Sequence, residues 1–516
     1  MSQQIVILDC YTDEPSGYGV RPYLGTHQLH LSQVLSHIGI VHHFITIDDL
    51  RYAASVRGMV MPSSDPRATR NTTKNAARAL DLISTADRIL VILGCFVDYD
   101  YFSCVPPRVD EVAHYLKNVS AETVAYFALG VPAKSSSKLV LPAGSIASFS
   151  QIQFGNAYRH ANAGFPACPP STFHAPDYKL LEEISTTPPD LLSQITDPVI
   201  CEIETGTGCN HPSCSFCIES LRKQRVVYRS PESIVNQVKT LYDSGIRHFR
   251  LGRQPNIYSY QRANPSRFEA LLGGIREACP EIRMLHVDNA NAMDVVTPAG
   301  IQFTKILVEY GTAGNVAPMG IESFDEKVRR LNTVRGSVDD IMRAIEIVSS
   351  HGKERGTNGL PKLLPGINLI HGLPGADSAS HAENLRCLRL ILDQGFMTFR
   401  TFYRDLAPPT GVSLNRLSFV TKPKYEHYRR DIVEQFVIPM QEKVYPAGIT
   451  LRGDWEIVQK GGEMHGRLFG STPIRIALEG QVSPGCGIPL SVNVTGNRDY
   501  RLLTGKVVSE MNLEAL

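Results

Sequence analysis

The chain has 516 residues, which is more than one ordinary hydrophobic core organises, so two or three domains are expected. Hydrophobic residues make up 43% of the sequence, charged residues 20%, and the formal net charge is +1. This composition carries no global signature of a nucleic-acid or membrane-surface protein. The strongest apolar run, residues 89–97, contains Gly94 and is shorter than a membrane span. No basic segment precedes the first strand-like residues, so no export signal is indicated and a cytoplasmic location is expected.

Residues 1–130 alternate between strand-like and helix-like patterns. Strands are expected at 5–8, 42–47, 88–93 and 123–127, and helices at 25–38 and 71–84. This alternation predicts an α/β domain with a doubly wound parallel sheet, which binds ligands at the carboxyl ends of its strands. The loops expected at those ends contain Gly17, Tyr18 and Gly19 after the first strand, Gly94 after the third and Gly130 after the fourth.

Three further segments follow this first domain. Residues 131–197 are rich in Ser, Pro, Ala and Gly and are expected to form an irregular connector. Residues 198–424 resume the alternation, with strands expected at 199–204, 248–252, 284–287, 316–321, 366–370 and 398–402. Six strand–helix repeats predict a partial (β/α)6 barrel with its site at the carboxyl ends of the strands. Residues 425–516 are expected to form a helix (425–444) and a small β-rich appendage.

The first expected barrel strand is followed by a loop with three closely spaced cysteines. Cys209, Cys214 and Cys217 have the spacing CxxxxCxxC, and three thiolates on one short loop can bind three irons of a [4Fe–4S] cluster while the fourth iron stays open. Two alternatives remain: a zinc site that takes His211 as its fourth ligand, or structural cysteines. The other eight of the eleven cysteines are isolated and are expected to be structural.

The cysteine loop resembles the cluster loop of the radical S-adenosylmethionine (SAM) superfamily, although its first gap is one residue longer than the common pattern. Other segments of 198–420 resemble the superfamily's SAM-binding strand ends. The resemblance implies that SAM is contacted by Gly252, Arg253 and Gln254 after the second strand, by Glu322 and Ser323 after the fourth, and by Asn368 and His371 of the fifth. The competing interpretations are an ordinary turn for the first group and a helix N-cap for Ser323.

A doubly wound domain before such a barrel resembles the cobalamin-dependent class of the superfamily. This resemblance implies that cobalamin binds near Gly17, Tyr18, Gly19, Gly94 and Gly130. The DxHxxG motif that supplies a cobalt-ligating histidine in part of this class is absent. The alternative is a degenerate domain that binds no ligand.

The resemblance implies a C-methyltransferase that acts on an unactivated sp3 carbon. In that class, a 5′-deoxyadenosyl radical abstracts hydrogen and methylcobalamin supplies the methyl group, so no catalytic side chain is required. The overall organisation also resembles archaeal enzymes that modify methyl-coenzyme M reductase, which implies a protein glutamine as substrate, a post-translational role in methanogenesis, and ferredoxin or flavodoxin as electron donor. Two alternatives are a tRNA-modifying enzyme of the methylthiotransferase type and a non-enzymatic corrinoid or iron–sulfur carrier. RNA binding is disfavoured because residues 445–510 are not rich in Lys or Arg.

Overall fold

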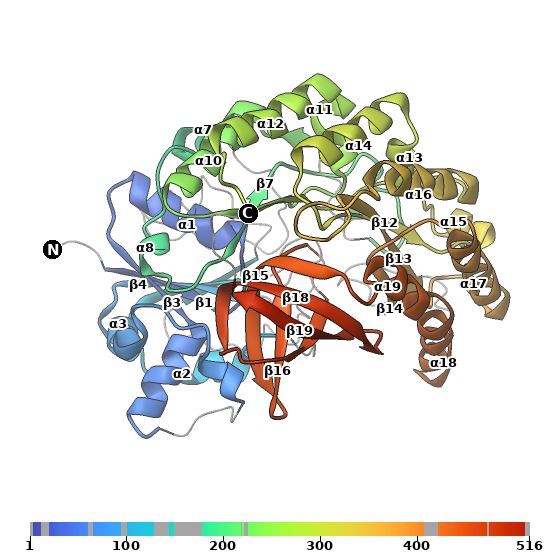
Figure 1. Cartoon of the computed structure of the whole chain (residues 1–516). Coiled ribbons are helices and arrows are strands. Elements are labelled where there is room, and N and C mark those ends of the chain that lie inside the picture. The colour runs from blue at the N-terminus through green and yellow to red at the C-terminus, as the bar shows by residue number, and fades with distance from the viewer. Residues whose placement is uncertain are drawn as a thin grey trace. The chain divides into compact units, whose positions relative to one another are not determined.

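The computed structural model describes residues 4–11, 20–59, 65–93, 101–127, 144–148, 178–217, 219–220, 225–406, 422–471 and 474–510. They form an α/β protein with a β-rich C-terminal part, as predicted (Figure 1). The chain divides into two compact units, one made of Met1–Glu204 and Glu232–Phe249 and the other of Thr205–Pro231 and Arg250–Leu516. No helix in the described ranges is long and apolar enough to cross a membrane.

The first unit contains most of the predicted N-terminal elements. Its strands are β1 (Ile5–Asp9), β2 (Tyr23–Leu24), β3 (His42–Thr46), β4 (Arg88–Leu93), β5 (Glu122–Phe127), β6 (Gly144–Ser148), β7 (Ile200–Glu204) and the start of β10 (His248–Gly252). Its helices are α1 (Thr26–His37), α2 (Ile47–Val56), α3 (Ala79–Thr85), α4 (Val109–Leu116), α7 (Tyr178–Ile184), α8 (Leu191–Gln194) and nearly all of α10 (Pro231–Asp243), with 3-10 turns at Pro66–Thr69 and Ala76–Arg78.

The main sheet of the first unit is parallel, with strand order β3-β1-β4-β5-β6. The chain starts in β1, adds β3 on one side and then adds β4 on the other, so the switch point lies between β1 and β4. Doubly wound sheets bind ligands in the crevice at the carboxyl ends of the strands at this point. The predicted doubly wound architecture is therefore confirmed.

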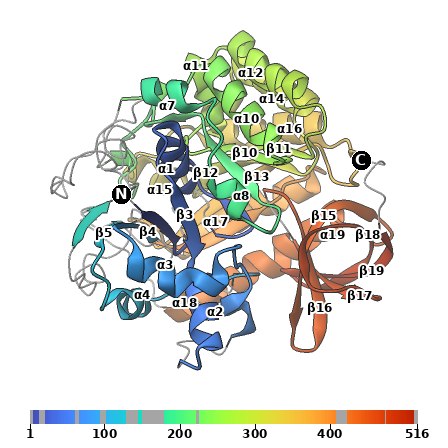
Figure 2. The ribbon, with the colours of Figure 1, turned by 90° about the vertical axis from the view of Figure 1, so that its left-hand side faces the viewer.

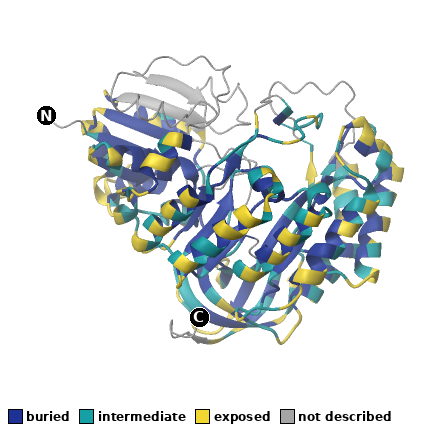
Figure 3. Cartoon of the chain, turned by 90° about the horizontal axis from the view of Figure 1, so that it is seen from above, coloured by how far each residue is buried: buried dark blue, intermediate teal, exposed yellow. Residues whose placement is uncertain are grey.

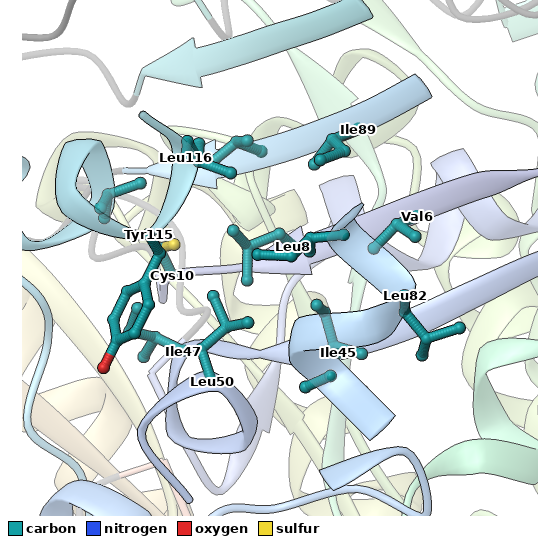
Figure 4. Close-up of a cluster of buried hydrophobic side chains, with 14 of the residues drawn as sticks. Val6, Leu8, Cys10, Ile45, Ile47, Leu50, Leu82, Ile89, Tyr115 and Leu116 are labelled. Carbon is teal, nitrogen blue, oxygen red and sulfur yellow. The ribbon is translucent and has the colours of Figure 1, made fainter. Parts of the chain in front are cut away.

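The core of this unit comes from short apolar strands that are covered on both faces. Figure 4 shows Val6 and Leu8 of β1 beside Ile45 of β3 and Ile89 of β4, together with Leu82 of α3. All five side chains are at most 3% exposed. Burial on both faces explains why the sequence of a parallel strand is a continuous apolar run instead of an alternating one.

In the first unit, two strands lie where no strand was expected. The segment 131–197, predicted as an irregular connector, contributes β6, which extends the main sheet beside β5. β6 has the sequence Gly-Ser-Ile-Ala-Ser, so it lacks the apolar run that identified the other strands, and only its pairing shows that it is a strand. β2 lies within the predicted first domain but pairs in parallel with β7, the first barrel strand.

The second unit continues the strand–helix alternation from the end of β10. Its strands are β8 (Gly206–Thr207), β9 (Val227–Tyr228), β11 (Met284–Val287), β12 (Asn315–Glu322), β13 (Leu363–His371) and β14 (Thr401–Asp405). Its helices are α11 (Tyr260–Ala263), α12 (Pro265–Ala278), α13 (Ala292–Val295), α14 (Pro298–Tyr310), α15 (Glu326–Leu331), α16 (Val338–Gly352), α17 (Ser378–Asp393), α18 (Lys422–Ile432) and α19 (Ile438–Val444), with a π-helical turn at Val433–Val437.

The strands β12, β13 and β14 of this unit are parallel, and the helices lie outside them. β12, β13 and β14 form one sheet in that order, and α12, α14 and α16 pack side by side (Figures 1 and 2). In Figure 3 the strands are buried, whereas the helices turn an exposed stripe outward. The last strand, β14, begins three residues later than the predicted 398–402.

The C-terminal segment forms a closed five-stranded barrel, where only a β-rich appendage was predicted. Its strands are β15 (Thr450–Lys460), β16 (Glu463–Leu468), β17 (Arg475–Glu479), β18 (Gly485–Asp499) and β19 (Leu502–Glu510). They close in the order β15-β16-β17-β19-β18, with β17 and β19 parallel and the other pairs antiparallel. Trp455, the single tryptophan of the chain, is fully buried in it.

A glycine at the end of α16 sets how closely this helix approaches β13. A Cβ on Gly352 would lie 1.9 Å from the carbonyl oxygen of Leu363. There is therefore no room for a side chain at position 352 between the helix and the strand. We expect Gly352→Ala to lower the free energy of unfolding by more than about 2 kcal/mol, in the range of strong overpacking. The control is Gly273→Ala on α12, where the added Cβ would meet only the Tyr310 ring at 3.5 Å and stability should rise by up to about 1 kcal/mol. Chemical denaturation followed by tryptophan fluorescence measures both, and equal effects would contradict the close-contact explanation.

Candidate functional site

The cysteine loop begins where β7 ends and is closed at its base by a short strand pair. Gly206 pairs with Tyr228, and Thr207 pairs with Val227. Gly208 then turns the chain with φ of 83°, a conformation that glycine adopts without strain. The predicted position of the cysteines after the first barrel strand is thus confirmed.

The loop is held in place by the residues that follow α15. Ser215 donates its hydroxyl to Asn332 Oδ1 at 2.8 Å, and its N–H bonds to the Asn332 carbonyl at 3.1 Å. Thr333 donates its hydroxyl to the carbonyl of Ser213. Asn332 is fully buried and also donates to the carbonyls of Val328 and Pro374. Sequence analysis missed these two residues because nothing in the local pattern connects 332–333 with a loop more than a hundred residues away.

His211, the candidate fourth zinc ligand, is engaged elsewhere. Its Nε2 lies 2.8 Å from the carbonyl oxygen of Thr333, and because a carbonyl only accepts, Nε2 must be the donor. Nε2 therefore has no lone pair for a metal, and a zinc site at this loop would have to use Nδ1 of His211.

The three cysteines are half-buried and close enough to influence one another. Burial raises the pKa of Cys214 to about 12 and that of Cys217 to about 11, and in both cases the charge of a neighbouring cysteine adds to the rise. Burial also raises the pKa of Cys209, while the N–H of His211, 3.3 Å from its sulfur, opposes the rise. Three such thiols on one anchored loop fit a cluster that binds them as thiolates and releases their protons. The described residues contain no group of three or more His, Cys, Asp or Glu placed around a single metal ion; cluster cysteines instead bind separate irons.

Three strand ends of this unit carry non-glycine residues in the left-handed region. The φ angles are 69° at Arg253 after β10, 35° at Asn289 after β11 and 66° at Glu322, which ends β12. Residues held in such conformations cost of order 1–3 kcal/mol each and cluster at functional sites. Arg253 and Glu322 are two of the predicted SAM-binding residues, so the strain lies where the site was expected.

The predicted residue Gln254 connects strand ends to one another. Its side-chain oxygen accepts from the Thr205 hydroxyl at 2.7 Å, and its Nε2 donates to the Asp288 carbonyl at 3.2 Å. The side-chain amide is therefore used within the protein. Sequence analysis missed the neighbouring buried ion pair between Arg250 and Asp288, whose side chains are 1% and 5% exposed. A charged residue inside an apolar strand, such as Arg250 in His-Phe-Arg-Leu-Gly, is the signal that could have revealed it.

Glu322 and Asn368 share one face of the β12–β13–β14 sheet. Gly320 pairs with Asn368, and Asn368 pairs with Phe402, so these three positions lie on the same face of the sheet. A bulge then pairs Glu322 with Leu369, but a Cβ on Gly320 would lie 2.6 Å from Glu322 Oε1, so the Glu322 carboxyl turns back to the Gly320 side. Burial raises the pKa of Glu322 to about 8, although Arg329 and Arg404 act against the rise. A mainly protonated carboxyl and a carboxamide can both donate and accept hydrogen bonds, as ribose hydroxyls require.

His371 lies on the other face of β13 from Asn368, because it is an odd number of residues further along the strand. Its Nδ1 is 2.5 Å from the Tyr403 hydroxyl, and its ring packs against Tyr425 and Tyr428 of α18. The structure therefore does not bring His371 together with Glu322 and Asn368. The sequence motif alone did not indicate on which face of the strand this ring lies.

Ser323 is not the N-cap of α15. The cap is Asp325, whose side chain accepts from the N–H groups of Lys327 and Val328. Ser323 is 4% exposed, and its hydroxyl accepts from the Asp325 N–H at 3.1 Å. The helix-cap explanation for Ser323 is therefore wrong, which leaves its predicted ligand role as a prediction.

In the first unit, the carboxyl end of β1 carries a buried carboxylate that sequence analysis missed. Asp9 is 1% exposed, and its Oδ1 accepts from the Tyr11 N–H at 2.9 Å and from Gln28 Nε2 at 3.0 Å. Asp9 Oδ2 and Gln28 Oε1 are both buried and have no hydrogen-bond partner among the described residues. These atoms lie beside the switch point, where a ligand of such a sheet would bind. The predicted contacts Gly17, Tyr18, Gly19, Gly94 and Gly130 lie outside the described residues.

Comparison with known proteins identifies the domain that carries the cysteine loop. Residues 203–371 match the radical SAM superfamily model. The uncharacterized protein MJ0274 of Methanocaldococcus jannaschii is 30% identical over 99% of this chain and 94% of its own length. A tRNA-2-methylthio-N(6)-dimethylallyladenosine synthase of Mycolicibacterium paratuberculosis is 24% identical over 60% of this chain and 59% of its own length.

Two solved structures share the fold. The radical SAM methyltransferase TsrM of Kitasatospora setae, determined with cobalamin and a [4Fe–4S] cluster, has a TM-score of 0.50 at 14% identity, over 78% of this chain and 72% of TsrM. The cobalamin-dependent SAM radical enzyme OxsB has a TM-score of 0.52 at 13% identity, over 84% of this chain and 55% of OxsB. The chain therefore contains a radical SAM domain and belongs to the same family as the Methanocaldococcus jannaschii protein.

Proposed function

We propose that the chain is a cobalamin-dependent radical SAM C-methyltransferase. The observation that carries the proposal is that one chain combines two features. One is an anchored three-cysteine loop at the end of a barrel strand, and the other is a doubly wound sheet with buried polar atoms at its switch point that have no hydrogen-bond partner among the described residues. The likeness in fold to TsrM and OxsB supports this combination.

Three groups of residues would bind the three cofactors. Cys209, Cys214 and Cys217 would hold the cluster, and the face with Glu322 and Asn368 would hold SAM. The crevice beside Asp9 would hold cobalamin, where the carboxyl and the Gln28 amide would bind polar groups of the corrinoid. When bound, the cluster and SAM supply radical chemistry and cobalamin supplies the methyl group; the protein orients these groups and excludes water.

A protein side chain, specifically a glutamine of methyl-coenzyme M reductase, stays the prediction of the sequence resemblance, as does a ferredoxin or flavodoxin electron donor. A second candidate function is RNA modification. The closed C-terminal barrel favours it, because small five-stranded barrels of this kind bind oligonucleotides. In addition, the Mycolicibacterium paratuberculosis relative, which matches over part of its length, is named as a tRNA-modifying synthase. Association with tRNA that weakens steeply with salt would support this second function.

Cofactor loading tests the proposed function. The full chain, purified without oxygen and with cobalamin supplied, should retain about four irons and about one corrinoid, as read by absorbance and elemental analysis. Incubation with methyl-labelled SAM and a reductant should transfer label to the corrinoid. Asp9→Ala should lower corrinoid retention and leave iron unchanged. Iron without corrinoid would preserve the radical SAM assignment and refute the cobalamin-dependent mechanism.

A further inference from the structure

β14 and the residue before it carry a column of two arginines separated by one phenylalanine. Arg400, Phe402 and Arg404 alternate, so they lie on the same face of the strand. The guanidinium carbons of Arg400 and Arg404 are 3.6 Å and 4.5 Å from the centroid of the Phe402 ring. Both distances are within the range of cation–π contacts. Along the strand, one arginine precedes the phenylalanine and the other follows it.

This column lies on the face of the sheet that carries the candidate SAM residues. Phe402 pairs with Asn368, and Arg404 pairs with Ile370 of the same strand. β14 is the last strand of the order β12-β13-β14, so the column follows directly after Glu322 and Asn368 along the sheet. A group that reaches the column is therefore next to the residues proposed to hold SAM.

The guanidinium of Arg404 lacks the close partners that the guanidinium groups of two buried arginines nearby have. Arg250 is paired with Asp288, and Arg329 donates to the carbonyls of Ile321, Ser323, Arg335 and Gly336. Arg404 is exposed; it is near enough to the Glu322 carboxyl to lower the pKa of that group, but within the described part of the chain it makes no ion pair within 4 Å.

Arg400 supports the other side of the ring. Its Nη1 donates to the Ser471 carbonyl at 3.3 Å, and its buried Nε has no partner among the described residues. It is partly buried, so it holds the ring and adds positive charge without reaching outward.

A guanidinium that stacks on an aromatic ring is pre-organised and leaves its N–H edge for two parallel hydrogen bonds to an oxyanion. We propose that Arg404 binds an oxyanion of the substrate, a phosphate or a carboxylate, and that Phe402 and Arg400 are positioning residues for it. This inference names the substrate class of the proposed methyl transfer, and it rests on that proposed function. Oxyanion binding itself is measured without turnover, so it can fail independently of the methyltransferase assignment.

Calorimetric titration of the full chain with inorganic phosphate and with acetate, at constant ionic strength, tests the proposal. We expect one of the two anions to bind with a Kd in the millimolar range or below. Arg404→Gln should raise this Kd at least tenfold. Arg404→Lys should recover only part of the affinity, because lysine keeps the charge but loses the planar fork. Phe402→Leu should weaken binding although every charge remains. Arg343→Gln, which removes an exposed arginine of α16 paired with Glu346, is the matched control and should leave the Kd unchanged.

The outcomes separate the sources of the oxyanion. Tighter binding of phosphate identifies a phosphate ester, and tighter binding of acetate identifies a carboxylate-bearing substrate. An unchanged Kd in Arg404→Gln, or no binding of either anion at about 50 mM, overturns the proposal. Displacement of the anion by SAM, together with weaker SAM binding in Arg404→Gln, also overturns it, since the column would then serve the SAM carboxylate. Unchanged thermal unfolding of each variant shows that a loss of binding is not a loss of folding.

Discussion

Replacement of Cys209, Cys214 or Cys217 by alanine is expected to abolish cluster retention. Each thiolate would bind a different iron, so two remaining ligands should not hold the cluster. After anaerobic reconstitution, we expect wild-type protein to keep about four irons per chain and each variant to fall well below one. Iron and sulfide analysis and the visible absorbance of the cluster measure this loss.

The matched control for this experiment is Cys387→Ala. Cys387 is 1% exposed on α17, so its removal perturbs packing without touching the loop. It should keep the full complement of iron. A Cys217→Ala protein should also retain corrinoid if the doubly wound unit binds it, because that site lies at the end of β1. Full iron retention in any of the three loop variants would refute the cluster assignment.

Arg51→Leu is expected to cause the largest loss of stability in the first unit. Arg51 is fully buried on α2 and donates to both carboxylate oxygens of Glu111, at 2.7 and 2.9 Å, and to Asp48 at 3.1 Å. Its Nη1 also donates to the Val105 carbonyl at 2.6 Å. Removal leaves two buried carboxylates without their cation, which typically costs about 3–5 kcal/mol.

The loss should grow with pH. Burial raises the pKa of Asp48 to about 7 even with Arg51 beside it, and without Arg51 this pKa must rise further. A carboxyl with a raised pKa binds more protons in the folded state than in the unfolded state, so stability falls as pH rises from about 4 towards the folded pKa. We therefore expect a larger difference between variant and wild type at pH 8 than at pH 6.

Circular dichroism during urea denaturation is the suitable measurement, because the single tryptophan, Trp455, lies in the second unit. Arg57→Leu is the control. Arg57 follows α2 and forms an exposed pair with Asp81, so its loss should cost less than about 1 kcal/mol. A similar cost for both arginines, or a loss independent of pH, would contradict the buried-network explanation.

The candidate site was only partly accessible from the sequence. The cysteine loop could be identified because its chemistry depends on spacing along thirteen consecutive residues, 205–217. The residues that anchor it, Asn332 and Thr333, could not, because they reach the loop only after α15 has folded back onto the barrel. Similarly, the motif that contains His371 placed it near the site, yet the alternation of side chains along β13 turns it to the opposite face from Asn368.

By itself, the sequence determined the order of strands and helices, the doubly wound character of the first domain and the position of the cysteines, since each follows from local hydrophobic period or short spacing. Only the tertiary structure decided that β6 extends the first sheet, that β2 pairs with β7 and that β15–β19 close into a barrel. The same holds for the stacking of Arg400 and Arg404 on Phe402 and for the burial of Asp9 Oδ2 without a hydrogen-bond partner among the described residues. The physical reason is that strand pairing and side-chain burial depend on which distant segments meet, and short-range hydrophobic patterns carry little information about that choice.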